Sequence, residues 1–144
     1  MATSAWNKFN DFSEQLVRGV HDFDANTFKV VLTNSAPTAA NTILTDITQI
    51  ANGGGYTTGG ETTTITISET SGTTTVSGTE IVWTGSGAGF GPFRYAVLYN
   101  DSSTAPADAL IAWFDYGSAI SVGASETFTL KFNNASPGTM FTLV

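Results

Sequence analysis

The sequence predicts an all-β fold: an antiparallel β-sandwich of seven or eight strands, jelly-roll or Ig-like, with one N-terminal amphipathic α-helix. Short segments that alternate apolar residues with threonine are separated by turns rich in glycine and asparagine. Threonine, which favours strands, supplies 24 of the 144 residues. No helical pattern separates the expected strands, so we expect antiparallel pairing within a single domain, residues 1–144.

The only convincing helix is predicted near the N-terminus, over about residues 5–18. We expect Ser4 to be the N-cap and Gly19 to end the helix. We expect this helix either to close the core or to reach a neighbouring subunit. The apolar residues that fall on one helical stripe are Trp6, Phe9, Phe12, Leu16, Val17 and Val20.

From residue 27 onward the apolar period changes to two, which is typical of strands. The stretch 41–51 is ambiguous, because its isoleucines have helical spacing but its threonines favour an irregular packed segment. Glycine-rich turns are expected at 52–55 and 85–89, and a further turn at 117–118. Strands are expected over residues 28–33, 62–69, 73–83, 93–100, 109–116, 126–133 and 140–144.

Two of the expected strands, 93–99 and 109–114, are apolar on both faces. Such strands must be covered on both sides. The second sheet can cover one side, whereas the other needs the N-terminal helix, the 43–50 segment or another subunit. This pattern indicates assembly, and the candidate interface residues are Trp6, Phe9, Phe12, Leu98, Ile111 and Trp113.

Charge and composition narrow the possible partners. Only 12% of the residues are charged, the net charge is −7, and the five basic residues are scattered. Because nucleic-acid binding needs a basic stripe, we expect no nucleic-acid partner. No apolar run is long enough for a membrane helix, and the absence of cysteine excludes disulfides. A neutral surface rich in threonine is either a solvated sheet face or a face that packs against neighbours.

Few residues could support catalysis. His21 is the only histidine, no nucleophile elbow is present, and a histidine beside a turn is expected to be a surface or capping residue. With one histidine and no cysteine, a catalytic zinc site is nearly excluded. The oxygen-rich stretch 100–103 could hold Ca²⁺ weakly, but it lacks EF-hand spacing. We therefore expect no enzymatic activity, no cofactor and no metal.

Two other features remain open. Asp115 alternates onto an apolar face, so we expect it to be partly buried and paired with Arg94 in an ion pair between strands. Exposed aromatic residues such as Trp83, Trp113 and Tyr116 could instead bind sugars.

Several blocks of the chain, in order and over nearly its whole length, resemble a family of small virion proteins of tailed bacteriophages. The blocks are KFNDF (8–12), GVH (19–21), FKVVLTNSAP (28–37), ITQIA (47–51), GPFRYAVLYN (91–100) and WFDYGS (113–118).

This resemblance implies a virion structural protein, assembled in the host cytoplasm and similar in size and fold to capsid decoration (cement) proteins. The implied partners are the major capsid protein and copies of the chain itself, with a homotrimer expected because decoration proteins commonly occupy threefold positions. The alternative is a tail or fibre component that binds carbohydrate or a receptor. The resemblance implies no catalytic residues.

Overall fold

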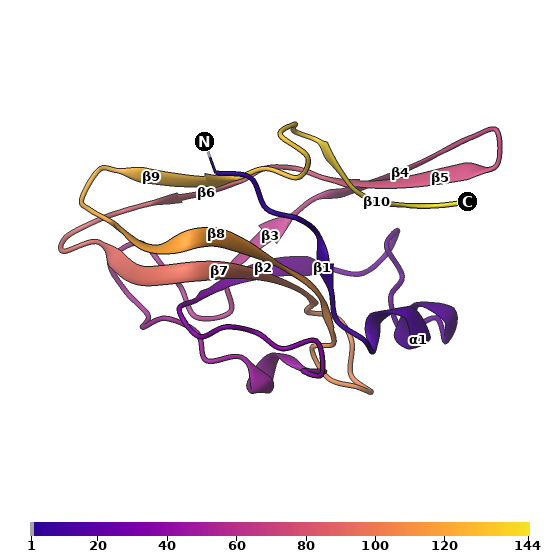
Figure 1. The fold of residues 1–144 in the computed structure, drawn as a ribbon, viewed down its shortest axis with the longest axis horizontal. Helices are drawn as coiled ribbons and strands as arrows, with labels where there is room; N and C mark the ends of the chain where they lie inside the picture. The colour runs from indigo at the N-terminus through magenta and orange to yellow at the C-terminus, as the bar shows by residue number, and fades with distance from the viewer. Residues whose placement is uncertain (1) are drawn as a thin grey trace.

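A computed structural model describes residues 2–144, and its main element is a five-stranded antiparallel sheet. Figure 1 shows this sheet as the lower layer of the molecule. The strand order is β1 (Asn7–Lys8), β8 (Leu110–Val122), β7 (Phe90–Asn100), β2 (Phe28–Thr33) and β3 (Glu61–Thr63).

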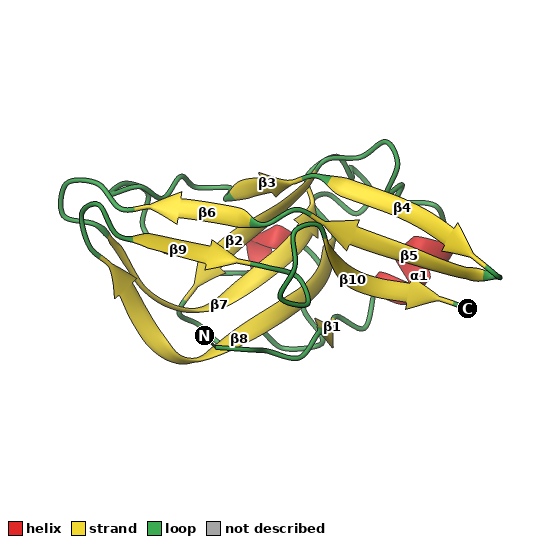
Figure 2. Cartoon of the chain, turned by 90° about the horizontal axis from the view of Figure 1, so that it is seen from above, coloured by secondary structure: helices red, strands yellow, loops and turns green. Residues whose placement is uncertain are grey.

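Two smaller antiparallel sheets lie above it, end to end (Figures 1 and 2). One contains β10 (Gly138–Leu143), β5 (Thr73–Gly78) and β4 (Ile65–Thr70), and the other pairs β6 (Ile81–Thr84) with β9 (Thr127–Leu130). The expected all-β, antiparallel fold is confirmed. The predicted count of seven or eight strands is wrong, because Thr64 and the residues after Gly78 divide two expected strands and because β1 is added.

The helix is much shorter than predicted. α1 spans only Phe12–Val17, and Asn7–Lys8 form β1, which pairs with β8. The predicted N-cap is also wrong, since Asp11 precedes the helix. The predicted end is right: Gly19 has a φ of +78°, and the N–H groups of Gly19 and Val20 donate to Leu16 and Gln15 in a Schellman arrangement. Among the described residues, neither α1 nor the short 3-10 helix η1 (Leu44–Asp46) is long and apolar enough to span a membrane.

The main core lies between the five-stranded sheet and the two smaller sheets. The large side chains of this core contact one another across the layers, as in Phe93–Phe128 with ring centroids 4.8 Å apart. Its fully or nearly fully buried members include Phe28, Val30, Leu32, Tyr56, Trp83, Phe93, Leu98 and Ile111.

A second, smaller core covers the opposite face of the five-stranded sheet. Val97 and Tyr99 of β7 are buried there, together with Phe9 and Ile47. The cover comes from the segment around η1, which the sequence left ambiguous, and from the residue that follows β1. The strands that are apolar on both faces are therefore covered within one chain, so they no longer require a partner subunit.

β8 is longer than expected because it continues through the predicted turn at 117–118. Tyr95 pairs with Asp115 and Phe93 pairs with Ile120. The two paired residues are therefore five positions apart in β8 but only two positions apart in β7. Gly117, with a φ of +99°, lies in this irregular stretch. The turn-forming residues thus form a bulge inside a strand, and β8 extends beneath β9.

Candidate functional site

The outer face of the β10-β5-β4 sheet carries hydroxyl side chains and no others. In the register of this sheet, Thr66 is opposite Ser77 and Ser68 is opposite Thr75, while Val76 faces the core. Side chains of paired residues share a face, and alternate residues along a strand share it too. The set, which we call the hydroxyl face, is Thr66, Ser68, Thr70, Thr73, Thr75, Ser77, Thr139 and Thr142.

Local sequence explains why this sheet is regular. In β4, Ile65 and Ile67 alternate with Thr66 and Ser68, which places the hydroxyl groups on the outer side; Ile67, on the inner side, remains 42% exposed. The hairpin between β4 and β5 turns through Ser71 and Gly72, both with positive φ, which matches the twist of the flanking strands. Figure 2 shows the resulting three strands as the outer layer at one end of the molecule.

The hydroxyl face is free to interact with another molecule. None of its eight side chains is buried, and in residues 2–144 none of their hydroxyl groups forms a hydrogen bond with the protein. Each hydroxyl can donate one hydrogen bond and accept two. The face therefore offers eight neutral groups on β-branched or short side chains that lose little rotamer freedom when they are covered.

Most of the predicted assembly residues belong to the chain's own core. Four are buried inside the monomer, so none of the four presents a surface to a partner. Trp6 is half-buried against Phe114 and Phe141, and Trp113 is half-buried against Phe9, with ring centroids 4.7 Å apart. The four buried residues are Phe9, Phe12, Leu98 and Ile111.

Arg94 and Asp115 form the ion pair that alternation suggested. Nε and Nη2 of Arg94 donate to the two carboxylate oxygens at 2.8 and 2.9 Å, and the backbone N–H of Gly117 donates to Oδ1 at 2.8 Å. The hydrogen bonds from Arg94, together with that from Gly117, lower the pKa of Asp115. Asp115 is therefore a fixed, ionised carboxylate at the surface, with about a third of its side chain exposed.

A pocket of about 370 Å³ opens beside this ion pair, between β8, β9 and the N-terminal residues 2–4. Its apolar lining includes Phe93, Phe114 and Phe128. The N-terminal segment is held beside β8 by Ser4, whose Oγ accepts a 2.7 Å hydrogen bond from the N–H of Asp115. We call this hollow the β8–β9 pocket.

Of the three aromatic residues considered for sugar binding, only Tyr116 lines this pocket. Trp83 is 1% exposed and lies in the main core, so it cannot contact a ligand without unfolding. Trp113 lies on the opposite side of the sheet, in the second core. Tyr116 is 38% exposed and makes an edge contact with Phe128 at 6.1 Å.

His21 is buried, which contradicts the expected surface or capping role. It is 4% exposed and lies between Phe12 and Phe23. Burial lowers the pKa of His21 from 6.5 to about 4, although the carboxylate of Asp11 acts in the opposite direction. Local sequence does not indicate this burial, because one of the residues that contact His21 is Asn100, 79 positions along the chain.

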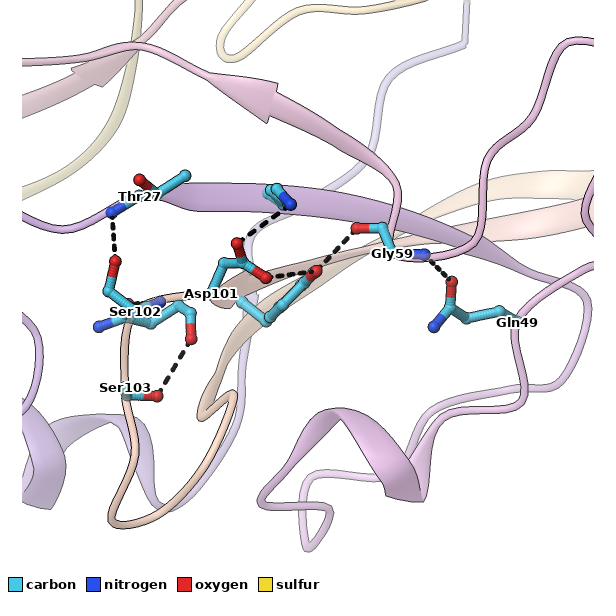
Figure 3. A network of polar contacts seen from close by, with 9 residues as sticks. Thr27, Gln49, Gly59, Asp101, Ser102 and Ser103 are labelled. Atoms are coloured by element: carbon cyan, nitrogen blue, oxygen red, sulfur yellow. Dashed lines mark hydrogen bonds and ion pairs between the residues drawn. The ribbon is translucent and has the colours of Figure 1, made fainter.

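The oxygen-rich stretch 100–103 takes part in structural hydrogen bonds (Figure 3). Oδ2 of Asp101 pairs with Nζ of Lys29 at 3.0 Å, and Oγ of Ser102 accepts a 2.9 Å hydrogen bond from the N–H of Thr27. These contacts tie the loop after β7 to the start of β2. Within residues 2–144, no group of three or more acidic, histidine or cysteine side chains is placed to hold a metal ion.

Comparison of the chain with protein-family models, with curated proteins and with solved structures gave no match. The two candidate sites, the hydroxyl face and the β8–β9 pocket, rest on the geometry of the structure alone.

Proposed function

We propose that this chain is a bacteriophage virion structural protein, a capsid decoration or cement protein that stabilises the head by binding where capsid subunits meet. The observation that carries the proposal is the hydroxyl face: eight unpaired, neutral side chains on a regular sheet. A protein that ties subunits together needs a rigid surface whose groups are inexpensive to desolvate, and hydroxyl groups lose less hydration on burial than charges do. The two layers of sheet, which we propose form a β-sandwich, supply the rigidity.

The proposed partners are the major capsid protein and other copies of this chain, arranged as a homotrimer. Since Leu98 and Ile111 are buried in the monomer, contacts must use surface groups, and the hydroxyl face is the largest uniform set described. Neutral hydrogen bonds give specificity without long-range attraction, which suits a protein with few charges. The competing tail or fibre role differs in location on the particle rather than in fold.

The test combines localisation with one substitution. Cryo-electron microscopy of intact virions is expected to show the protein on the head, with β4, β5 and β10 against capsid subunits. Purified Thr75→Arg protein, changed at the centre of the hydroxyl face, is to be added to heads made without the wild-type protein. We expect the variant to occupy at least tenfold fewer sites on these heads than added wild-type protein does. The matched control is Thr104→Arg, on an exposed loop far along the chain from this sheet.

Two outcomes would overturn the proposal. One is density for the protein on the tail alone, which would favour the tail or fibre role. The other is equal loss of head binding for Thr75→Arg and Thr104→Arg, which would mean that added charge anywhere on the chain disturbs binding. Circular dichroism of both variants establishes that each remains folded.

We also propose that the chain has no catalytic activity. His21 is enclosed by aromatic rings, and the exposed carboxylate of Asp115 is bound to Arg94. Incubation of the wild-type protein with glycans, peptidoglycan and esters is expected to give no turnover. Turnover that disappears in Asp115→Asn or His21→Ala would contradict this expectation.

A further inference from the structure

The β8–β9 pocket holds an unusual share of the chain's positive charge. Two of the five basic residues, Arg94 and Lys131, line it, whereas only one of the twelve acidic residues, Asp115, does so. The protein as a whole carries a net charge of −7. Basic side chains therefore outnumber acidic ones in the lining of this pocket, which gives it donors for an anionic ligand.

The positive groups keep free hydrogen-bonding capacity. Arg94 uses Nε and Nη2 for Asp115, and in the described part of the chain its Nη1 has no protein partner. Lys131 is held only by a 3.4 Å contact with Glu80, and both of these side chains are 39% exposed. Both cations are thus paired with carboxylates, Arg94 closely with Asp115 and Lys131 more loosely with Glu80, which does not line the pocket. Because an exposed pair of this kind is weak, an anionic ligand can replace Glu80 beside Lys131.

The same pocket has an aromatic wall. Tyr116 is exposed at its rim and Phe128 is half-buried beside it, with their rings inclined at 67°. A sugar ring has one face of C–H groups that packs on an aromatic surface, while its hydroxyl groups need polar partners around the edge. Such partners are present in Asn133, Asn134 and the fixed carboxylate of Asp115, which retains free lone pairs.

We propose that the β8–β9 pocket binds an acidic saccharide, a sugar ring that carries a carboxylate. Its volume of about 370 Å³ suits a small ligand. In this arrangement the sugar stacks on the exposed ring of Tyr116, beside Phe128. Its carboxylate approaches Lys131 and the free Nη1 of Arg94, and Asp115 accepts hydrogen bonds from its hydroxyl groups. None of the eight residues of the hydroxyl face lines this pocket, so the site does not rest on the proposed attachment to the capsid.

The test is a nuclear magnetic resonance titration of the purified protein with sialyllactose and, separately, with lactose, which lacks the acidic sugar. Sialyllactose is expected to shift the amide signals of residues 93–96, 114–116 and 127–134, and lactose is expected to bind at least tenfold more weakly. Lys131→Gln is expected to raise the Kd for sialyllactose by about tenfold, the usual effect of losing one hydrogen bond to a charged group. Tyr116→Ala is expected to weaken binding to a similar extent.

The matched control is Lys29→Gln. Lys29, like Lys131, is a partly exposed lysine in an ion pair, but it does not line the pocket. This variant is expected to bind sialyllactose with unchanged affinity. The proposal is overturned if no acidic sugar shifts these signals, if lactose binds equally well, or if inorganic phosphate competes fully, which would indicate an anion site without sugar recognition. Equal effects of the two lysine substitutions would also overturn it.

Discussion

Nδ1 of His21 lies 3.2 Å from Nδ2 of Asn100, although 79 positions separate the two residues. An amide nitrogen only donates, so Nδ1 is the acceptor in this contact, which corresponds to a neutral imidazole with its proton on Nε2. Nδ2 of Asn100 also donates to the carbonyl of Val20 and to Oδ1 of Asn26. Nε2 of His21 is buried without a hydrogen-bond partner in the described residues. Burial holds His21 in its uncharged form, at the junction between the turn after α1 and the end of β7.

This arrangement predicts that acid destabilises the protein. The pKa of His21 is about 4 in the folded chain and about 6.5 when unfolded, so the unfolded state binds the proton first. The contribution of His21 to stability is complete above pH 6.5, falls between pH 6.5 and 4, and is then lost. The decrease in unfolding free energy amounts to about 3 kcal/mol.

Urea denaturation between pH 7 and pH 4 measures this effect. His21→Gln cannot gain the charge, so its stability is expected to fall less steeply than that of the wild type. Any decrease due to carboxylates is shared by both proteins and cancels in the comparison. Parallel pH profiles for the two proteins would show that His21 is not held uncharged in the folded state.

Trp6 is expected to act in folding rather than in binding a partner. Its ring lies 5.8 Å from that of Phe114 and 5.6 Å from that of Phe141, so it joins the N-terminal segment to two sheets. Trp6→Ala is expected to lower the unfolding free energy by about 2–3 kcal/mol, somewhat less than for a fully buried aromatic residue. Val17→Ala, at a side chain that is 88% exposed, is the control and is expected to change it by less than about 0.5 kcal/mol. If Trp6→Ala keeps the melting temperature of the wild type but binds to fewer sites on heads, Trp6 contacts a partner rather than stabilising the fold.

The two glycine-rich turns touch, and this contact predicts different effects of two similar substitutions. Gly54 and Gly87 have φ values of +63° and +56°, but a Cβ on Gly54 would lie 1.7 Å from the carbonyl oxygen of Gly89, whereas one on Gly87 would meet nothing. Gly87→Ala is expected to lower the unfolding free energy by about 1–2 kcal/mol, because alanine disfavours this backbone conformation. Gly54→Ala is expected to cost roughly 1–3 kcal/mol more, because backbone must move. Equal losses of stability for Gly54→Ala and Gly87→Ala, measured by thermal denaturation, would contradict the close approach of Gly54 to Gly89.

The proposed binding of this protein to the capsid is expected to be insensitive to salt. The contact proposed for the hydroxyl face uses neutral hydrogen bonds, which ions screen little. Binding to heads is therefore expected to persist up to ~1 M salt, where the Debye length is about 3 Å. Cosedimentation of the protein with heads at increasing salt measures this. Release at moderate salt would show that ion pairs dominate the contact.

The sequence predicted strands better than it predicted their partners. β2 begins and ends where expected, because Phe28 and Thr33 are bounded by turn residues. The helix prediction failed because Trp6 and Phe9 share a helical stripe but lie on opposite sides of the five-stranded sheet, which a helix cannot achieve. Extended backbone at β1 separates them.

The candidate sites depended on register, which spacing alone does not give. Six residues of the hydroxyl face lie on the hairpin of β4 and β5, and the pairing of β10 with β5 places Thr142 beside Thr75, 67 positions away. The β8–β9 pocket depends on the bulge that carries β8 past Gly117. The Arg94–Asp115 pair could be inferred from alternation, because both residues lie within segments that were correctly expected to be strands.

The pairing of Asn7 with Trp113 has a consequence for how the protein is made. A strand near the start of the chain cannot find its partner until more than a hundred residues have followed it, and β2 must likewise wait for β7. Pairing between distant segments closes large loops and is slow. During synthesis Trp6 and Phe9 consequently remain exposed to water until β8 has been made and can pair with β1.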